Sequence, residues 1–334
     1  MAPREVRQRK VAPLLELFIA VLLVVPVGPA ACDLLVAGAF LVEFLTGGAH
    51  RPLSALTAPP RREALSVAGA AVDRWVGPAG GGPLVLVHGY APAGKDEPRV
   101  LEAAALLARA GFDVAVPTIP GLTRGRLRPD DVPPVVATLA ARAAPTAVVA
   151  VSVGSGPALL AAADPAVRDR VRVVLSLGGY ASAAELLRFF LTGEYAWNDI
   201  RGRVVHEREV VRWFLEANSD LLDTPVREAL ADPARATIAL AAPSPAVASL
   251  LAALSPERVA AGITARLVLV HGVHDQAVPY TESLRLAAAR PERTQVVLVH
   301  LLDHVEAGRP QAWVSALREG VALTLVLYGL LAGG

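Results

Sequence analysis

Ser152 lies where an apolar segment of strand length meets an Ala- and Leu-rich segment of helical composition. Residues 147–151 read Ala-Val-Val-Ala-Val, and the sequence Ser-Val-Gly-Ser-Gly begins at Ser152. A serine on a sharp turn between a buried strand and a helix needs small neighbours, which Ala150 and Gly154 provide. Such a turn exposes the hydroxyl and points the helix N-terminus toward it, so that the Val153 backbone N–H can stabilise an oxyanion. The pattern therefore predicts that Ser152 is a nucleophile.

A serine hydroxyl is a weak nucleophile near neutral pH, so it needs a base, and the base needs a group that orients it. Asp275 follows the apolar run 267–270, and His304 follows the apolar run 295–300. Both side chains are therefore expected just past the carboxyl ends of strands. In this interpretation His304 takes the proton from Ser152, and Asp275 orients the imidazole.

Neighbouring residues leave alternatives open. Ser155 could supply the hydroxyl instead, but it lies a turn into the helix, where we expect it to cap or pack. His300 competes with His304, although its place on the strand favours a core or strand-end histidine. His274 and Asp303 are the fallback base and acid. A short Ser- and Gly-rich run is also typical of ordinary turns and of helix starts that bind anions.

No metal or cofactor is expected. His271, His274 and Asp275 could form a metal site, but they are crowded into one loop and no distant third ligand is indicated. Cys32 is the sole cysteine, which excludes an intramolecular disulfide and a multi-cysteine metal site. We expect His271 to be a satisfied strand-end histidine.

The elements that would position these residues begin near residue 63. From there, strand-length apolar runs alternate with helical segments, which predicts an α/β fold with a mostly parallel central sheet and helices on both faces. The stretch from about 181 to 262 breaks the alternation, is largely helical in composition and holds six of the 16 aromatic residues. We expect a helical lid inserted over the carboxyl edge of the sheet, although about half of its aromatic side chains would simply form the lid's own core.

Together these features resemble the α/β-hydrolase fold, in the neighbourhood of dienelactone-hydrolase-like and serine-aminopeptidase-like members. The resemblance includes the turn around Ser152, the order of the three candidates along the chain and the segment 84–90, whose Leu-Val-Leu-Val-His-Gly-Tyr is similar to the family's strand ending in His-Gly. The chain departs from the common pattern in having Ala150 where glycine is usual, and it lacks the run of glycines found in some lipases and esterases.

The resemblance implies a role for each candidate. Ser152 would be the nucleophile, His304 the general base and Asp275 its orienting acid. The backbone N–H groups of Tyr90 and Val153 would form the oxyanion hole. We expect His88, next to this loop, to organise it by hydrogen bonding.

The N-terminal segment points to a membrane. A basic leader, residues 1–10, precedes the uninterrupted apolar run Leu17–Val25. The small residues that follow fit a signal peptide cleaved after Ala30, whereas residues 14–31 are long enough for an uncleaved transmembrane helix. A second apolar stretch, Leu34–Leu45, suits a helix that lies at the membrane interface or packs on the soluble domain. The segment could instead be an extra core helix of a cytosolic enzyme.

These observations divide the chain into a hydrophobic anchor or signal segment with a short apolar helix (1–47), a Gly-, Pro- and Arg-rich linker (48–62) and a hydrolase domain with its lid (63–334). Of the 334 residues, 54% are hydrophobic, and 32 Lys and Arg residues oppose 31 Asp and Glu residues without a block of like charge. Nucleic-acid binding is therefore not expected. Two charged loops, 95–99 and 123–128, are interpreted as ordinary surface.

The sequence thus predicts a membrane-associated or exported serine hydrolase that cleaves a carboxylic ester, or alternatively a thioester or amide, through an acyl-enzyme. Its partners would be a small-molecule or lipid-like acyl substrate and the membrane. Two other functions remain open. One is acyl transfer with the same three residues, and the other is a non-catalytic, membrane-tethered protein that binds a partner or lipid with its lid.

Overall fold

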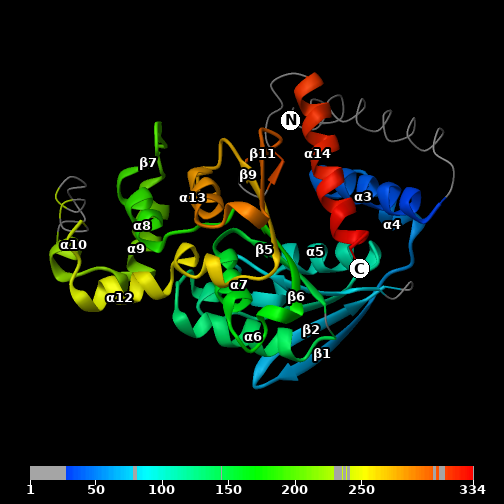
Figure 1. Ribbon diagram of the computed structural model, residues 1–334, viewed down its shortest axis with the longest axis horizontal. Helices are drawn as coiled ribbons and strands as arrows, with labels where there is room; N and C mark the ends of the chain where they lie inside the picture. Colours follow the sequence, from blue (N-terminus) through cyan, green and yellow to red (C-terminus); the bar gives the residue numbers. More distant parts are fainter. Residues whose placement is uncertain are drawn as a thin grey trace.

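The computed structural model describes residues 28–77, 81–143, 145–228, 235, 238, 241–303, 306–307 and 313–333 (Figure 1). The basic leader, the apolar run Leu17–Val25 and His304 lie outside these ranges.

An eight-stranded sheet forms the centre of the molecule, in the order β1-β2-β4-β3-β5-β6-β9-β10. Strand β2 pairs antiparallel with β1 and β4, and every other neighbouring pair is parallel. This is the mostly parallel sheet that the sequence predicts. The strands are β1 (Arg61–Val67), β2 (Ala70–Val76), β3 (Pro83–Val87), β4 (Asp113–Pro117), β5 (Thr146–Val151), β6 (Val171–Leu177), β9 (Arg266–Gly272) and β10 (Thr294–Val299).

Both faces of the sheet are covered. Successive side chains of a strand point to opposite sides of the sheet, so each central strand contributes to two cores. In β5, Val148 and Ala150 face a core shared with α6 (Val132–Ala140), α7 (Ser155–Ala163) and the insertion. Ala147 and Val149 face a second core, which is shared with three helices: α3 (Pro29–Leu45), α5 (Pro98–Arg109) and α14 (Trp313–Leu331). The continuous apolar sequence of the strand is therefore buried on both sides. The last helix of the sheet layers is α13 (Thr281–Ala289), between β9 and β10.

The insertion between β6 and β9 is not purely helical. It holds a two-stranded antiparallel hairpin in addition to the helices that its composition predicts. In Figure 1 it lies at the end of the molecule away from α3 and α14. Its elements are α8 (Ala183–Thr192), β7 (Glu194–Trp197), β8 (Ile200–Arg203), α9 (Arg208–Ala217), α10 (Thr224–Glu228) and α12 (Pro245–Ala253).

The N-terminal part of the described chain packs on the domain. The predicted second apolar stretch lies within α3, whose Ala39 and Leu41 are buried in the same core as α5 and α14. The residues interpreted as a linker contain a short helix, α4 (Pro52–Leu56), with Leu53 buried, and the first two residues of β1. None of the helices among the described residues has the length and apolar character needed to cross a membrane.

Candidate functional site

Ser152 lies on the tight turn between β5 and α7. Its backbone φ is 53°, a left-handed conformation that is rare for a residue other than glycine and that commonly marks a functional turn. A single 3₁₀ turn, Ser152–Gly154, joins the strand directly to the helix. A Cβ on Gly154 would overlap the carbonyl oxygen of His88, and a Cβ on Gly89 would lie 3.1 Å from the Cβ of Ser152. The turn is therefore packed closely against the end of β3.

Ser155, the alternative hydroxyl, is fully buried. It accepts a hydrogen bond of 2.8 Å from the Oγ of Ser176 on the neighbouring strand β6. This agrees with the expectation that Ser155 packs inside the helix rather than reacting.

His88 organises the loop after β3. Its Nδ1 donates to the carbonyl oxygen of Gly89 at 2.7 Å, and its Nε2 accepts from the backbone N–H of Ile119 at 3.1 Å. These partners require the neutral ring, and burial lowers the pKa of His88, which keeps it neutral. The loop that carries the Tyr90 N–H is thereby fixed to the segment that follows β4.

The side chain of Tyr90 contacts the insertion. Its ring lies against Trp213 of α9, with ring centroids 4.6 Å apart. Trp213 also fills the space above Gly125, where a Cβ would overlap the indole. Residues of the insertion therefore reach the loop that carries one candidate oxyanion donor.

Asn218, which follows α9, fastens the insertion to the same part of the domain. It is fully buried, its Nδ2 donates to the carbonyl oxygen of Gly125 at 2.8 Å, and its Oδ1 accepts from the N–H of Leu127 at 2.8 Å. Arg128 adds an ion pair of 2.7 Å with Asp220. The loop 123–128, interpreted from the sequence as ordinary surface, is thus a docking point for the insertion.

Glu282 of α13 holds the other end of the insertion. Its buried carboxylate accepts hydrogen bonds from the N–H groups of Ala181 and Ser182, at 3.0 and 2.8 Å, and from Arg285 at 3.1 Å. Burial raises the pKa of Glu282 above its ordinary value. Sequence reasoning did not single out Glu282 or Asn218, because their partners are distant along the chain.

Asp275 lies in the loop after β9 and is almost completely buried. Its Oδ1 accepts from the N–H groups of Ala277 and Val278, at 2.8 and 2.9 Å, and its Oδ2 lies 3.3 Å from the Nε2 of His271. Backbone donors of this kind stabilise the ionised carboxylate and fix its orientation. The geometry suits an acid that orients another group.

His271 is satisfied by its own surroundings, as the sequence suggests. Its Nε2 lies 2.9 Å from the carbonyl oxygen of Val278, to which it must donate, so its Nδ1 accepts from the hydroxyl of Ser283 at 2.7 Å. It supports the Asp275 loop and has no free ring nitrogen for catalysis.

His300 is bound to the C-terminal helix. Glu319 of α14 accepts from the Nδ1 of His300 at 2.9 Å and from the backbone N–H groups of His300 and Leu301, at 2.7 and 2.9 Å. The ring of His300 also lies near that of His274, with centroids 5.4 Å apart. Glu319 was not anticipated from the sequence, and it fixes the chain four residues before His304.

The candidate residues share one edge of the sheet. Strands β5, β6, β9 and β10 are consecutive parallel neighbours, so the positions that follow them lie at the same carboxyl edge. Ser152 follows β5 and Asp275 follows β9. The segment with His304 follows β10, but His304 itself lies outside the described residues.

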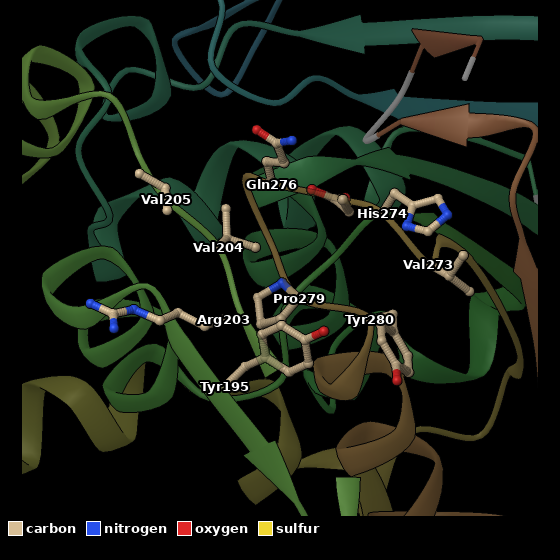
Figure 2. Close-up of a pocket in the computed structure, with 10 residues that line it drawn as sticks. Tyr195, Arg203, Val204, Val205, Val273, His274, Gln276, Pro279 and Tyr280 are labelled. Atoms are coloured by element: carbon tan, nitrogen blue, oxygen red, sulfur yellow. The ribbon is translucent and has the colours of Figure 1, made fainter. Parts of the chain in front are cut away.

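A cavity of about 350 Å³ lies between the insertion and the Asp275 loop (Figure 2). The rings of Tyr195 and Tyr280 approach each other across this boundary, with centroids 5.9 Å apart. The insertion thus forms one wall of a space beside the candidate acid, which suits a lid. The lining residues are Tyr195, Arg203, Val204 and Val205 from the insertion, and Val273, His274, Asp275, Gln276, Pro279 and Tyr280 from the loop.

No protein-family model matches the sequence, and a search of curated proteins finds no match. Among solved structures, a 2,6-dihydroxy-pseudo-oxynicotine hydrolase is similar over 98% of this chain and 85% of its own, with 20% identity and a TM-score of 0.51. An acylaminoacyl peptidase from Pyrococcus horikoshii (15% identity, 83% of this chain, TM-score 0.49) and a puromycin-hydrolyzing peptidase from Mycobacterium tuberculosis (19%, 83%, 0.49) are also similar. The chain spans 41% and 39% of the lengths of these two peptidases.

The strand order, the insertion after β6 and the similarity to the first of these structures define one class of architecture. The chain has the α/β-hydrolase fold. Fold similarity at this level of identity does not by itself assign an activity.

Proposed function

We propose that the protein is a serine hydrolase that cleaves a carboxylic ester through an acyl-enzyme intermediate. The observation that carries this proposal is the strained backbone of Ser152, held at φ 53° between β5 and α7. Strain of this kind persists only where the surrounding structure enforces it, and here it presents a hydroxyl at the carboxyl edge of the sheet. A thioester or amide is the alternative substrate class.

In the proposed reaction, His304 takes the proton of the Ser152 hydroxyl while the Oγ forms a bond to the carbonyl carbon. The electron pair of the C=O bond moves to oxygen, where the N–H groups of Tyr90 and Val153 stabilise the negative charge. The intermediate then expels the alkoxide, which His304 protonates. Water, deprotonated by His304, then attacks the acyl carbon, and the second intermediate breaks its bond to the Ser152 Oγ, which takes the proton back from His304 as the acid leaves.

Asp275 would stabilise the imidazolium that His304 becomes during each step. Two backbone N–H groups already hold its carboxylate, so little reorganisation is needed when the positive charge develops. The reaction needs no cofactor. Among the described residues, no group of three or more His, Cys, Asp or Glu side chains could hold a metal ion.

The proposal is tested by the turnover of nitrophenyl esters of increasing acyl length. Ser152→Ala should lower kcat/KM by roughly 10³-fold or more, because the covalent intermediate is lost. Ser155→Ala is the matched control, since this buried hydroxyl contacts only the protein interior, and it should retain activity. Normal turnover of every ester by Ser152→Ala would overturn the assignment. An acyl-enzyme that accumulates and discharges only to an added alcohol or amine would favour acyl transfer.

We also propose that residues 14–31 attach the protein to a membrane. The support is the run of nine apolar residues from Leu17 to Val25 and the basic leader before it. Whether this segment is retained as an anchor or removed as a signal peptide is decided by the N-terminal sequence of the mature protein.

A further inference from the structure

The C-terminal helix α14 has an outward face without charged side chains over most of its length. No charged residue occurs from Gly320 to Leu331. Leu323 and Leu330 point inward and are buried, whereas Val321 and Leu325, one turn apart, are 47% and 56% exposed. A helix on the surface of a soluble domain normally turns a polar face to water. This stripe lacks a partner among the described residues.

The stripe lies on a helix that packs against the first helix of the described structure. Helix α14 packs against α3 (Figure 1), and α3 begins at Pro29. The apolar run Leu17–Val25 ends only three residues before Gly28, the first described residue. The helix that follows this run in the sequence is thus a neighbour of α14 in the fold.

Arginine residues lie at both ends of α14, one beside the stripe and two on the strands that meet the C-terminal end of the helix. Arg318, three positions before Val321, is exposed on the same side of α14. At the other end, Arg172 donates to the carbonyl oxygen of Leu330 at 2.7 Å, and the guanidinium of Arg266 lies 3.4 Å from the place of a Cβ on Gly329. An apolar stripe between cationic ends is complementary to the acyl chains and anionic headgroups of a lipid surface.

We propose that the outward face of α14 rests on the same bilayer that takes up residues 14–31. Val321 and Leu325 would enter the boundary between headgroups and acyl chains, with Arg318 at the level of the phosphates. The C-terminal helix is then a second membrane contact, besides the N-terminal segment. This inference depends on the proposed membrane attachment and is independent of the proposed hydrolase chemistry.

The sole cysteine allows a direct test on the full chain. Cys32 is exposed at the start of α3 and can be labelled with an environment-sensitive fluorophore, and a Cys32→Ser background allows the same label at Leu325→Cys or Leu65→Cys. Leu65 is the matched control, because it is an exposed leucine (42%) on β1, away from α14 in Figure 1. Each protein is reconstituted into vesicles of phosphatidylcholine and phosphatidylglycerol in equal parts, with or without bromine on the acyl chains.

An interfacial helix buries its apolar face about 5–10 Å into the lipid, so bromine should quench the label at position 325 at least about twofold more than the label at position 65. Quenching at position 32 but not at 325 would overturn the inference and leave the N-terminal attachment standing. It would mean that residues 14–27 or a second copy of the chain covers α14. Failure of the full chain to remain with the vesicles would overturn both membrane proposals, and neither result alters the ester assay.

Discussion

At the scale of single residues, the geometry around Ser152 depends on the absence of side chains nearby. The hydroxyl is presented by a backbone with positive φ, and this turn can approach β3 only because Gly154 and Gly89 have no Cβ. Small residues at these positions are thus a requirement of the turn, whatever chemistry it performs.

Replacing Gly154 tests this requirement. Gly154→Ala places a methyl group against the carbonyl oxygen of His88, so we expect the free energy of unfolding to fall by about 1–3 kcal/mol, together with a loss of ester turnover. Denaturant titration measures the stability. Gly262→Ala is the control, because a Cβ there meets no atom within 4 Å. Equal stability of the two variants would show that the turn has room to relax.

Asp131 gives a prediction about pH. Burial raises the pKa of its carboxyl to about 6, although it accepts hydrogen bonds from the N–H groups of Gly121 and Arg128. The folded state therefore binds a proton that the unfolded state releases between about pH 4 and pH 6, so stability falls as the pH rises through this window. Relative to Asp131→Asn, the wild type should lose about 2 kcal/mol between pH 4 and pH 7.

Urea denaturation at several pH values measures this difference. The neighbouring exposed Asp130 contributes least to the raised pKa of Asp131, so Asp130→Asn is the control and should change the pH dependence much less than Asp131→Asn. A stability difference between wild type and Asp131→Asn that does not vary with pH would contradict the raised pKa.

The candidate site was partly predictable at this scale. Ser152, Asp275 and the internal roles of His88 and His271 follow from local sequence, because each lies at or just past the end of an apolar strand, and the role of Ser155 follows from its place in the helix that comes next. The supporting residues Asn218, Glu282 and Glu319 were not predictable. Each is an ordinary polar residue in sequence, and its role comes from hydrogen bonds to backbone groups that only the folded chain brings near.

At the scale of elements, two side chains connect loops to neighbouring elements. Asn218 binds the insertion to the loop after β4, and Glu319 binds α14 to the segment after β10. Both residues use side-chain groups to satisfy backbone groups of a loop, which fixes the loop without a strand or helix.

Removing the first connection should loosen the insertion. Asn218→Ala leaves the carbonyl oxygen of Gly125 and the N–H of Leu127 without these partners, at a cost of about 1–3 kcal/mol. Limited proteolysis under native conditions should then cut the insertion at least about tenfold faster, since 1.4 kcal/mol corresponds to a factor of ten. Ser219→Ala at the adjacent position is the control. Unchanged cleavage would mean that Trp213 and Arg128 hold the insertion without Asn218.

Removing the second connection should affect the candidate base. Glu319→Ala removes the acceptor of the N–H groups of His300 and Leu301. The segment that continues to His304 then loses the hydrogen bonds that hold its first two residues in place. Because small misplacements of catalytic groups are costly, we expect kcat to fall by roughly tenfold to a hundredfold with little change in KM. Glu319→Gln, which keeps an acceptor oxygen, should retain more activity. Arg318→Ala, an exposed neighbour on α14, should behave as wild type, and a loss equal to that of Glu319→Ala would contradict this role.

The parallel strands were predictable because they are short, continuous apolar runs. The hairpin of β1 and β2 was not, since β1 reads Arg-Arg-Glu-Ala-Leu-Ser-Val and its strand geometry comes from pairing with β2 at the edge of the sheet. The hairpin of β7 and β8 was not predictable either, because a four-residue strand is too short to show a clear alternation of apolar and polar residues. The strand conformation of such segments depends on pairing with another strand.

At the scale of the whole molecule, different features lie at the two ends. The insertion borders the cavity beside Asp275 at one end, and α3 and α14 gather at the other (Figure 1). The sheet separates the core that contains the insertion from the core that contains these helices. The insertion and the helices of the proposed lipid contact therefore belong to different layers of the molecule.

The proposed function requires an activated serine at position 152 of this fold. The most direct measurement is labelling of the purified full chain with a fluorophosphonate, followed by identification of the modified peptide by mass spectrometry. We predict a single adduct on Ser152, and no adduct in Ser152→Ala or His304→Ala. A folded wild type that stays unlabelled, or an adduct on another residue, would contradict the account and favour a non-catalytic protein with a hydrolase fold.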